Sequence, residues 1–164
     1  MKPPAVIPVD KLNLEPYASI VCYPRASTTG IQSRIEELQK RGVQALEFAG
    51  KASAFSVPVL GKGYVGIVAI AHLNGERLAL KMRRLDADRK GLEHEAELLI
   101  KANSIGVGPK FITATKDFLF MQLIEGDFLS DWLEKNGDNG LEQVDPAMTP
   151  RIMKPCSHVY PHYI

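Results

Sequence analysis

The sequence predicts an α+β fold in which antiparallel strands form a sheet and a helix packs on it. The sheet is predicted from two apolar runs, 67–71 and 78–80, which flank the dipeptide Asn74-Gly75. Asn-Gly between two such runs favours a two-residue hairpin turn. The helix is predicted from apolar residues that recur with helical spacing between about 88 and 103. An N-terminal extension with a helix of its own precedes this domain.

Length and composition limit the classes of protein that the chain can belong to. Its 164 residues suit one domain with tails, and a net charge of +1 gives no reason to expect nucleic acid as a partner. Cys22 and Cys156 are too few for a disulfide framework, and the N-terminus lacks an apolar stretch of signal-peptide length, so we expect a cytoplasmic protein. The most apolar window, 57–73, is interrupted by glycines and a lysine, so no membrane partner is expected.

Residues 1–45 are predicted to form the extension. Its prolines between 3 and 24 exclude a long helix there, and residues 17–23 are predicted as a short strand. Ser27 marks a helix start and Gly42 its end. The helix is predicted to bury Ile31, Ile35 and Leu38 and to expose Arg34, Glu36, Glu37, Lys40 and Arg41. We expect it to pack on the following domain. A winged helix-turn-helix would need more chain, so DNA binding is not favoured.

Beyond residue 45 the pattern is that of strands before and after the main helix. A second hairpin follows the helix, which is predicted to stop at Gly106. A short helix is predicted at 129–135, and residues 138–164 show four prolines and no periodicity, so we expect an irregular tail. The predicted strands are 45–48, 56–60, 65–73, 77–82, 111–114 and 118–124.

Three glycines are the first candidate for chemistry. Gly61, Gly63 and Gly66, with Lys62 between the first two, form a G-x-G-x-x-G pattern. Glycines at this spacing let the backbone turn tightly and approach a phosphate without side-chain obstruction. In a dinucleotide-binding fold the third glycine would open a helix. Here it opens the strand that contains Val68, so the pattern indicates a loop between two strands that covers phosphates.

Lys81 lies near the end of the strand that follows the hairpin turn. It shares a strand face with Ala79, and Val68 lies across the hairpin from them. Small apolar residues beside a lysine can form a floor under an adenine ring while the ammonium reaches a phosphate. The alternative is a lysine whose ammonium only extends into water at the strand end.

Glu95 is the candidate partner of Lys81. The apolar stripe of the main helix consists of Leu92, Ala96, Leu99 and Ala102. Glu95 lies three residues after the first of these and four before the third, so it falls inside the stripe. Glu97 lies well outside it and Glu93 on its edge, and both are expected in solvent. Because an unpaired buried carboxylate is costly, we expect Glu95 to form an ion pair with Lys81.

The last predicted strand is expected to continue into a hinge at 121–127. Backbone groups from Met121 to Leu123 would bind the edge of an adenine, and Asp127 would reach a ribose hydroxyl. A compatible alternative is a buried strand that runs into a helix capped by Asp127. A further hypothesis places a metal on Cys156, His158 and His162, but three ligands without a second cluster do not favour it.

These residues together resemble a known family. From about Leu46 to Lys135 the chain resembles the N-terminal lobe of the eukaryotic-like protein kinase superfamily. The glycine pattern, the strand with Lys81, the helix segment His94-Glu95-Ala96-Glu97-Leu98-Leu99 and the hinge occur in the family's order. The short separation of Lys81 from Glu95 looks most like the RIO-type and small archaeal atypical serine/threonine kinases.

The resemblance implies a five-stranded antiparallel sheet with one main helix, and ATP or ADP beneath the glycines. It implies that Lys81 contacts the α- and β-phosphates, that Glu95 fixes Lys81, and that Met121 is the gatekeeper. It also implies an ATP-binding lobe at 46–126, followed by a hinge with a short helix at 127–137.

The chain also departs from the family. Protein kinases carry a catalytic aspartate in an H-R-D loop and a metal-binding aspartate in Asp-Phe-Gly, both in a second lobe. Neither motif occurs, because Asp117 and Asp127 precede phenylalanines only in the hairpin and the hinge. We therefore assign no catalytic residue, expect Mg²⁺ only with a complete second lobe, and expect no phosphoryl transfer from these residues alone.

Two other functions remain open. A non-catalytic interaction module could use the same sheet, and its exposed apolar floor would then bind a partner chain or form a homodimer. A small β-rich binding domain unrelated to nucleotides is the third hypothesis. The sequence does not identify a protein substrate.

Overall fold

An antiparallel sheet forms the centre of the fold, which belongs to the α+β class. The computed structural model describes residues 4–126 together with residues 131 and 134, and within them the sheet has seven strands. Their order is β1-β2-β6-β7-β9-β8, and β5 pairs with β6 beside this path. The strands are β1 (Ala5–Pro8), β2 (Val43–Phe48), β5 (Gly61–Lys62), β6 (Gly66–Leu73), β7 (Glu76–Arg83), β8 (Phe111–Ala114) and β9 (Phe118–Gln122).

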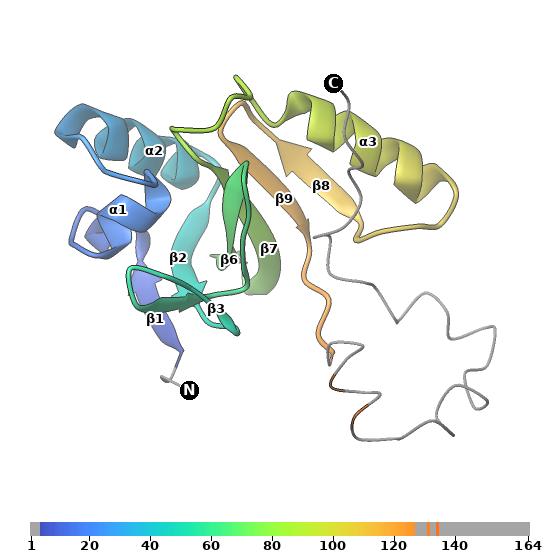
Figure 1. The fold of residues 1–164 in the computed structure, drawn as a ribbon, viewed down its shortest axis with the longest axis horizontal. Helices are drawn as coiled ribbons and strands as arrows, with labels where there is room; N and C mark the ends of the chain where they lie inside the picture. The colour runs from blue at the N-terminus through green and yellow to red at the C-terminus, as the bar shows by residue number, and fades with distance from the viewer. Residues whose placement is uncertain (1–3, 127–130, 132–133, 135–164) are drawn as a thin grey trace.

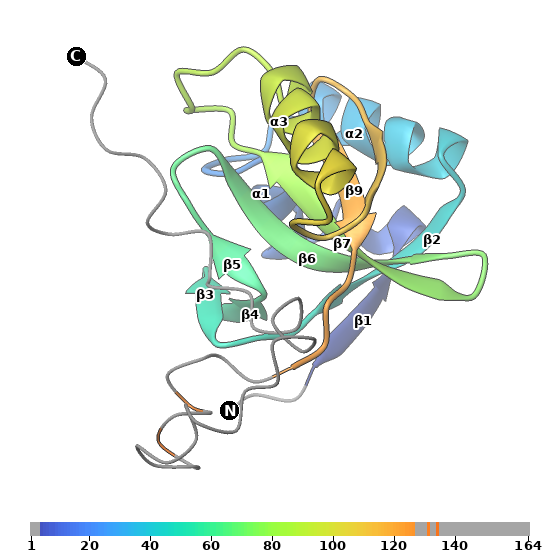
Figure 2. The same cartoon turned by 90° about the vertical axis from the view of Figure 1, so that its right-hand side faces the viewer.

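Helices cover both faces of this sheet. The helices α1 (Tyr17–Val21) and α2 (Thr28–Lys40) lie on one face, and α3 (Glu93–Ser104) lies on the other (Figure 1). Figure 2 shows α3 in front of β7 and β9, with α2 behind them. A 3₁₀ turn (Val9–Lys11) follows β1, and β3 (Ala52–Ala54) with β4 (Val57–Val59) forms a separate two-stranded sheet.

The face beneath α1 and α2 holds the main hydrophobic core. Ile67 of β6, Leu80 of β7 and Phe120 of β9 are fully buried there, together with Leu38 of α2. Side chains alternate between the two faces along a strand, so the neighbours of these residues point toward α3. One face is therefore closed by the N-terminal helices, and the other carries the residues that the sequence singled out.

A smaller cluster holds α3 on its face of the sheet. Leu92 and Ala96 pack on Leu119 of β9, and this arrangement confirms the predicted apolar stripe. The helix begins at Glu93, later than predicted, because the backbone N–H of Leu92 donates to the carbonyl of Lys116 (3.0 Å) and the preceding segment forms turns. Gly106, with a φ of +74°, lies just beyond the helix end, as predicted.

The two predicted hairpins are confirmed. Asn74 and Gly75 join β6 to β7 with positive φ values of 51° and 82°, which is the geometry that an Asn-Gly turn provides. The strands β8 and β9 form the second hairpin. In the Asn-Gly turn, sequence preference and the twist of the paired strands favour the same backbone conformation.

The prediction of five strands is wrong. The described residues contain two further members of the main sheet, β1 from the extension and the two-residue β5 at the glycines. The strand β3 was also missed, because Phe55 and Ser56 form its turn to β4 with positive φ values of 49° and 63°. Neither residue type favours that backbone region, so the sequence contains no turn signal there.

The prediction of a strand at 17–23 is also wrong, because residues 17–21 form α1. Ala18, Ile20 and Val21 are all buried, and a short run of buried apolar residues suits a helix as well as a strand. The carboxylate of Glu15 accepts hydrogen bonds from the backbone N–H and the hydroxyl of Ser19 (3.3 and 2.8 Å) and supports the first helical turn.

The helix α2 follows its prediction except at Arg34 and at Glu37, which is only partly exposed. The hydroxyl of Ser27 accepts a hydrogen bond from the N–H of Gly30 (3.1 Å) and caps the helix start. Arg34, which was predicted in solvent, is 4% exposed. It lies three residues after Ile31 and four before Leu38, so helical geometry places it among the buried residues.

Several predictions fall outside the described residues. These are the role of Asp127, the short helix at 129–135 apart from Asp131 and Glu134, and the tail with its possible metal ligands. Across the residues that the structure does describe, no helix is long and apolar enough to cross a membrane. The same residues contain no group of three or more histidine, cysteine, aspartate or glutamate side chains placed to hold a metal.

Candidate functional site

The register of the sheet places most of the predicted site residues on one face. Val68 of β6 lies opposite both Gly61 of β5 and Lys81 of β7, and Ala79 lies opposite Met121 of β9. Paired residues of antiparallel strands share a face, as do residues two apart on one strand. All five residues therefore belong to the face that α3 covers.

Lys81 and Glu95 form the predicted ion pair. The Lys81 Nζ lies 2.5 Å from the Glu95 Oε1, and the two side chains are 19% and 27% exposed. Glu93 and Glu97 are exposed, as predicted. The pair joins the sheet to the first turns of α3. A lysine held in this way is a positive charge fixed at the edge of an apolar surface, on a side chain that is still partly exposed to solvent.

Gly66, the third glycine of the pattern, lies too close to the neighbouring strand β7 to carry a side chain. A Cβ atom on Gly66 would lie 2.7 Å from the carbonyl oxygen of Met82 and 3.0 Å from side-chain carbons of Lys81. At Gly61 and Gly63 a Cβ would meet nothing closer than 3.8 Å. Gly66 therefore serves the packing of β6 on β7, whereas packing of the described residues does not explain the other two glycines.

Residues 61–66, which run from β5 to the first residue of β6, form a tight turn closed by a hydrogen bond from the N–H of Gly63 to the carbonyl of Gly66 (2.9 Å). We call it the glycine loop. Tyr64 at its tip is 95% exposed, and Val65 packs against the cluster beneath α3. The loop thus extends into solvent at one end and is attached to the helix at the other.

The glycine loop is also held from the face of the N-terminal helices. Arg84 donates from Nη1 to the carbonyl of Gly63 (2.9 Å), and its guanidinium lies 4.6 Å from the ring centre of Tyr23. Lys62 contacts the same ring, with its Nζ 4.8 Å from the centre. The side chain of Lys62 therefore lies on the face opposite to Lys81, and only its backbone is placed to meet a ligand beneath the loop.

Met121 and Leu123 are placed where the hinge was predicted. Met121, at the end of β9, and Leu123, just beyond it, are both half-buried. Arg77 connects this segment to the sheet, because its Nη1 lies 2.5 Å from Glu125 and its Nη2 lies 3.1 Å from Glu47. The start of the hinge is thereby fixed to β7, next to the floor that Ala79 forms.

Glu47 is an acidic residue of this face that the sequence did not single out. His72 Nε2 lies 2.8 Å from its carboxylate. Burial alone would raise the pKa of Glu47, but the hydrogen bonds with His72 and Arg77 outweigh it and lower the pKa below its ordinary value. No pattern in the sequence around Glu47 marks it, because its partners come from two other strands.

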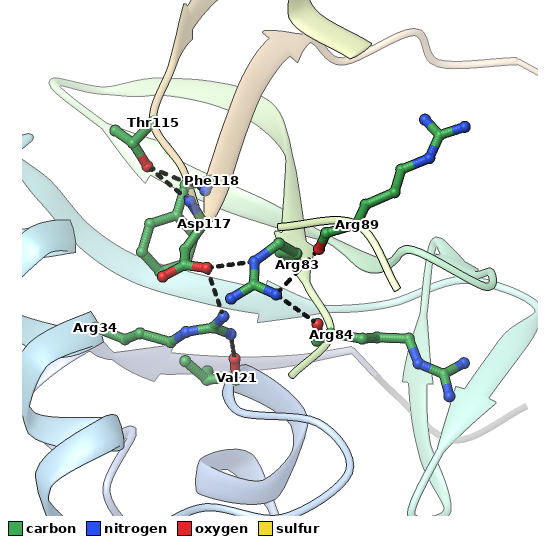
Figure 3. A network of polar contacts seen from close by, with 8 residues as sticks. All are labelled: Val21, Arg34, Arg83, Arg84, Arg89, Thr115, Asp117 and Phe118. Atoms are coloured by element: carbon green, nitrogen blue, oxygen red, sulfur yellow. Dashed lines mark hydrogen bonds and ion pairs between the residues drawn. The ribbon is translucent and has the colours of Figure 1, made fainter. Parts of the chain in front are cut away.

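Sequence reasoning also missed a charged network centred on Asp117. This residue, in the turn between β8 and β9, lies between Arg34 of α2 and Arg83 of β7 (Figure 3). Arg83 follows Lys81 by two residues, so the network adjoins the candidate site. Arg34 could have been found by the rule that identified Glu95, since both occupy a position inside an apolar helix stripe.

The described residues that the sequence singled out form a candidate binding site, and we assign no catalytic role to any of them. A fixed cation, an apolar floor and a glycine loop fit a ligand with an aromatic ring and an anionic end. Cys22 is no candidate nucleophile, because burial raises the pKa of its thiol and keeps it protonated. A shallow hollow of about 470 Å³ lies elsewhere, between the end of α3 and β8, lined among others by Ile100, Asn103 and Phe111.

Comparison with known proteins adds no assignment. No protein-family model matches the chain, and no curated protein resembles it significantly.

Proposed function

We propose that the chain contains the ATP-binding lobe of a serine/threonine protein kinase of the RIO-like kind. The observation that carries the proposal is the Lys81–Glu95 ion pair, which lies on the same face as Val68 and Ala79 and adjoins the glycine loop. A strand lysine held by a helix glutamate next to a glycine-rich loop is the arrangement with which protein kinases hold nucleotide phosphates.

Each wall of the site would bind one part of the nucleotide. The adenine would lie on the floor formed by Val68 and Ala79, with its edge toward backbone groups between Met121 and Leu123. The Lys81 ammonium would contact the α- and β-phosphates, and Glu95 would hold it in place. The backbone at Gly61 and Gly63 would cover the phosphates, because both residues leave room that packing does not use.

The proposed activity of the whole protein is phosphoryl transfer from ATP to a protein. We assign neither a carboxylate pair for Mg²⁺ nor a catalytic base to the described residues, among which no group of three or more potential metal-ligating side chains is found. Nucleotide binding is therefore the part of the function that we assign to this chain.

A non-catalytic interaction module is the second candidate. It is favoured by exposed aliphatic side chains near the end of α3, where Ile100, Ile105 and Val107 are between 48% and 78% exposed. Apolar side chains in solvent favour contact with a partner or a second copy of the chain.

Binding of Mg-ADP and Mg-ATP to the full chain tests the first candidate. We expect a rise in melting temperature with either nucleotide, and we expect Lys81→Met to abolish it. Lys62→Met is the matched control, because it removes a lysine from the glycine loop on the opposite face and should leave the shift unchanged. A wild-type chain without a shift, together with a dimer in light scattering, would refute nucleotide binding and support the interaction module.

Gly63 sharpens this test. Gly63→Ala should weaken ADP binding while leaving the nucleotide-free melting temperature within about 1 °C, since the new methyl group meets nothing closer than 3.8 Å. A loss of stability without a loss of binding would show that Gly63 serves the fold rather than a phosphate.

A further inference from the structure

The helix α2 of the N-terminal segment is connected to the candidate site through charged side chains, of which Arg34 is buried and Asp117 and Arg83 are partly buried. We propose that Arg34 and Asp117 are positioning residues, which hold the start of α3 so that Glu95 meets Lys81. The N-terminal segment would thereby set the affinity of the nucleotide site. This inference deepens the proposed function and rests on it for the effect on nucleotide affinity, although its structural part can be tested without a nucleotide.

The first link runs from α2 to the turn between β8 and β9. Arg34 is 4% exposed, and its Nη2 lies 3.1 Å from the Asp117 Oδ1. Its Nη1 donates to the carbonyl of Val21 at the end of α1, and its guanidinium lies 5.6 Å from the ring centre of Phe118. These neighbours restrict the positions open to the guanidinium and to the carboxylate that it faces (Figure 3).

The second link runs from Asp117 to the end of β7. Arg83 donates from Nε to the Asp117 Oδ1 (2.6 Å), and its backbone N–H donates to the Asp117 carbonyl (2.8 Å). The Nη1 of Arg83 donates to the carbonyls of Arg84 and Arg89 at 3.2 and 3.4 Å. Both carbonyls belong to the segment between β7 and α3, so Asp117 fixes this segment through Arg83.

The third link joins the same turn to the helix itself. The carbonyl of Lys116, next to Asp117, accepts the N–H of Leu92, the residue that precedes α3. The carbonyl of Leu92 accepts the first helical hydrogen bond, from Ala96 (2.9 Å). Glu95 lies between these two residues. The turn at 116–117 therefore controls where the helix begins and which way Glu95 points.

The charges show why Arg34 matters to this geometry. Two guanidiniums share the single carboxylate of Asp117, and in Figure 3 Asp117 lies between the arginines. Without Arg34 the carboxylate keeps Arg83 but loses its tie to α2, so the turn can move with β7. If the turn moves far enough to break the hydrogen bond from the Leu92 N–H to the Lys116 carbonyl, the start of α3 moves with it and Glu95 no longer meets Lys81. Such coupling through two arrangements of a packed turn is typically worth five-fold or more in affinity.

The test uses Arg34→Met in the full chain, with Arg41→Met as the matched control. Arg41 lies at the end of α2 and donates to the Thr113 hydroxyl (3.0 Å), but it is exposed and outside the network. Without nucleotide, hydrogen exchange at the amides of 96–98 should be about tenfold faster in Arg34→Met and unchanged in the control. If exchange in Arg34→Met were accelerated by the same factor at all amides of the sheet and α3, Arg34 would have a merely structural role and the proposal would be overturned.

Nucleotide affinity supplies the second readout. Arg34→Met should weaken ADP binding about five- to tenfold. In a chain that already carries Glu95→Gln, the same change should weaken ADP binding by less than about twofold. Equal losses in both backgrounds would mean that Arg34 does not act through Glu95. If Arg34→Met fails to fold, Arg34→Lys replaces it, because lysine keeps the positive charge but lacks the two separate Nη groups with which Arg34 contacts Val21 and Asp117. A wild-type chain that binds no ADP would sink the proposed function, while the exchange data would still decide the positioning role.

Discussion

Replacing Gly66 by alanine should lower stability because the glycine lets β6 lie directly against β7. The new Cβ would lie 2.7 Å from the Met82 carbonyl oxygen, which belongs to the sheet backbone and cannot turn away. It would also lie 3.0 Å from two carbons of the Lys81 side chain. Relief of these contacts requires the strands to separate by several tenths of an ångström, and the hydrogen bonds between them lengthen.

The expected loss is about 2 kcal/mol, in the range for an extra methyl group in a packed region. For a fold of this size the melting temperature should fall by about 5 to 10 °C. Gly61→Ala is the control, because its Cβ would make only ordinary contacts of 3.8 and 3.9 Å with Val68. Urea unfolding of the nucleotide-free chain, followed by circular dichroism, gives both free energies. Equal free energies of unfolding for the two variants, within about 0.5 kcal/mol, would refute the close-approach argument.

Three further predictions concern charged groups and the glycine loop. Glu95→Gln should reduce the free energy of unfolding by about 1 kcal/mol more than Glu97→Gln, because only the first change leaves the half-buried Lys81 without its carboxylate. Equal losses of stability in thermal denaturation would contradict the ion-pair assignment. Tyr23→Leu should speed hydrogen exchange at the Gly63 amide about three- to tenfold, because the ring contacts Arg84, which donates to the Gly63 carbonyl; unchanged exchange would show that the ring is not needed. Since the folded-state pKa of Glu47 is lowered, its stabilisation is complete above its ordinary pKa of about 4.5 and is lost as the pH falls through the lower folded-state pKa. Glu47→Gln should therefore reduce the acid dependence of the unfolding free energy below about pH 5, and an unaltered pH profile would argue against its bonds to the sheet.

Local signals in the sequence predicted the parts of the fold that depend on neighbouring residues. Asn74 and Gly75 specify a turn by their own backbone preferences, and Ser27 caps α2 with its own side chain. Glu95 could be placed because its environment follows from helical spacing alone. Its partner followed because Lys81 is the nearest cation on the adjoining strand.

The missed features depend on residues far apart in the chain. Asp117 is an ordinary turn residue until Arg34 and Arg83 meet it, and neither partner is close in sequence. The strand β1 has only four residues, and it becomes a strand because β2 offers an edge for pairing. The prediction that Arg34 is exposed was avoidable, because the helical spacing that placed Glu95 in an apolar stripe also places Arg34 in the apolar stripe of α2.

The face closed by α1 and α2 also affects how the chain is made. Leu38 is synthesised early, but Phe120, with which it shares the core, leaves the ribosome 82 residues later (120 − 38). At about 5 to 20 residues per second, α2 would wait roughly 4 to 16 seconds for the last strand of that face. We therefore predict that ribosome-bound chains arrested before β9 are cut by proteases within α2, whereas longer chains resist. Equal protection of both would show that the N-terminal helices fold without the sheet they cover.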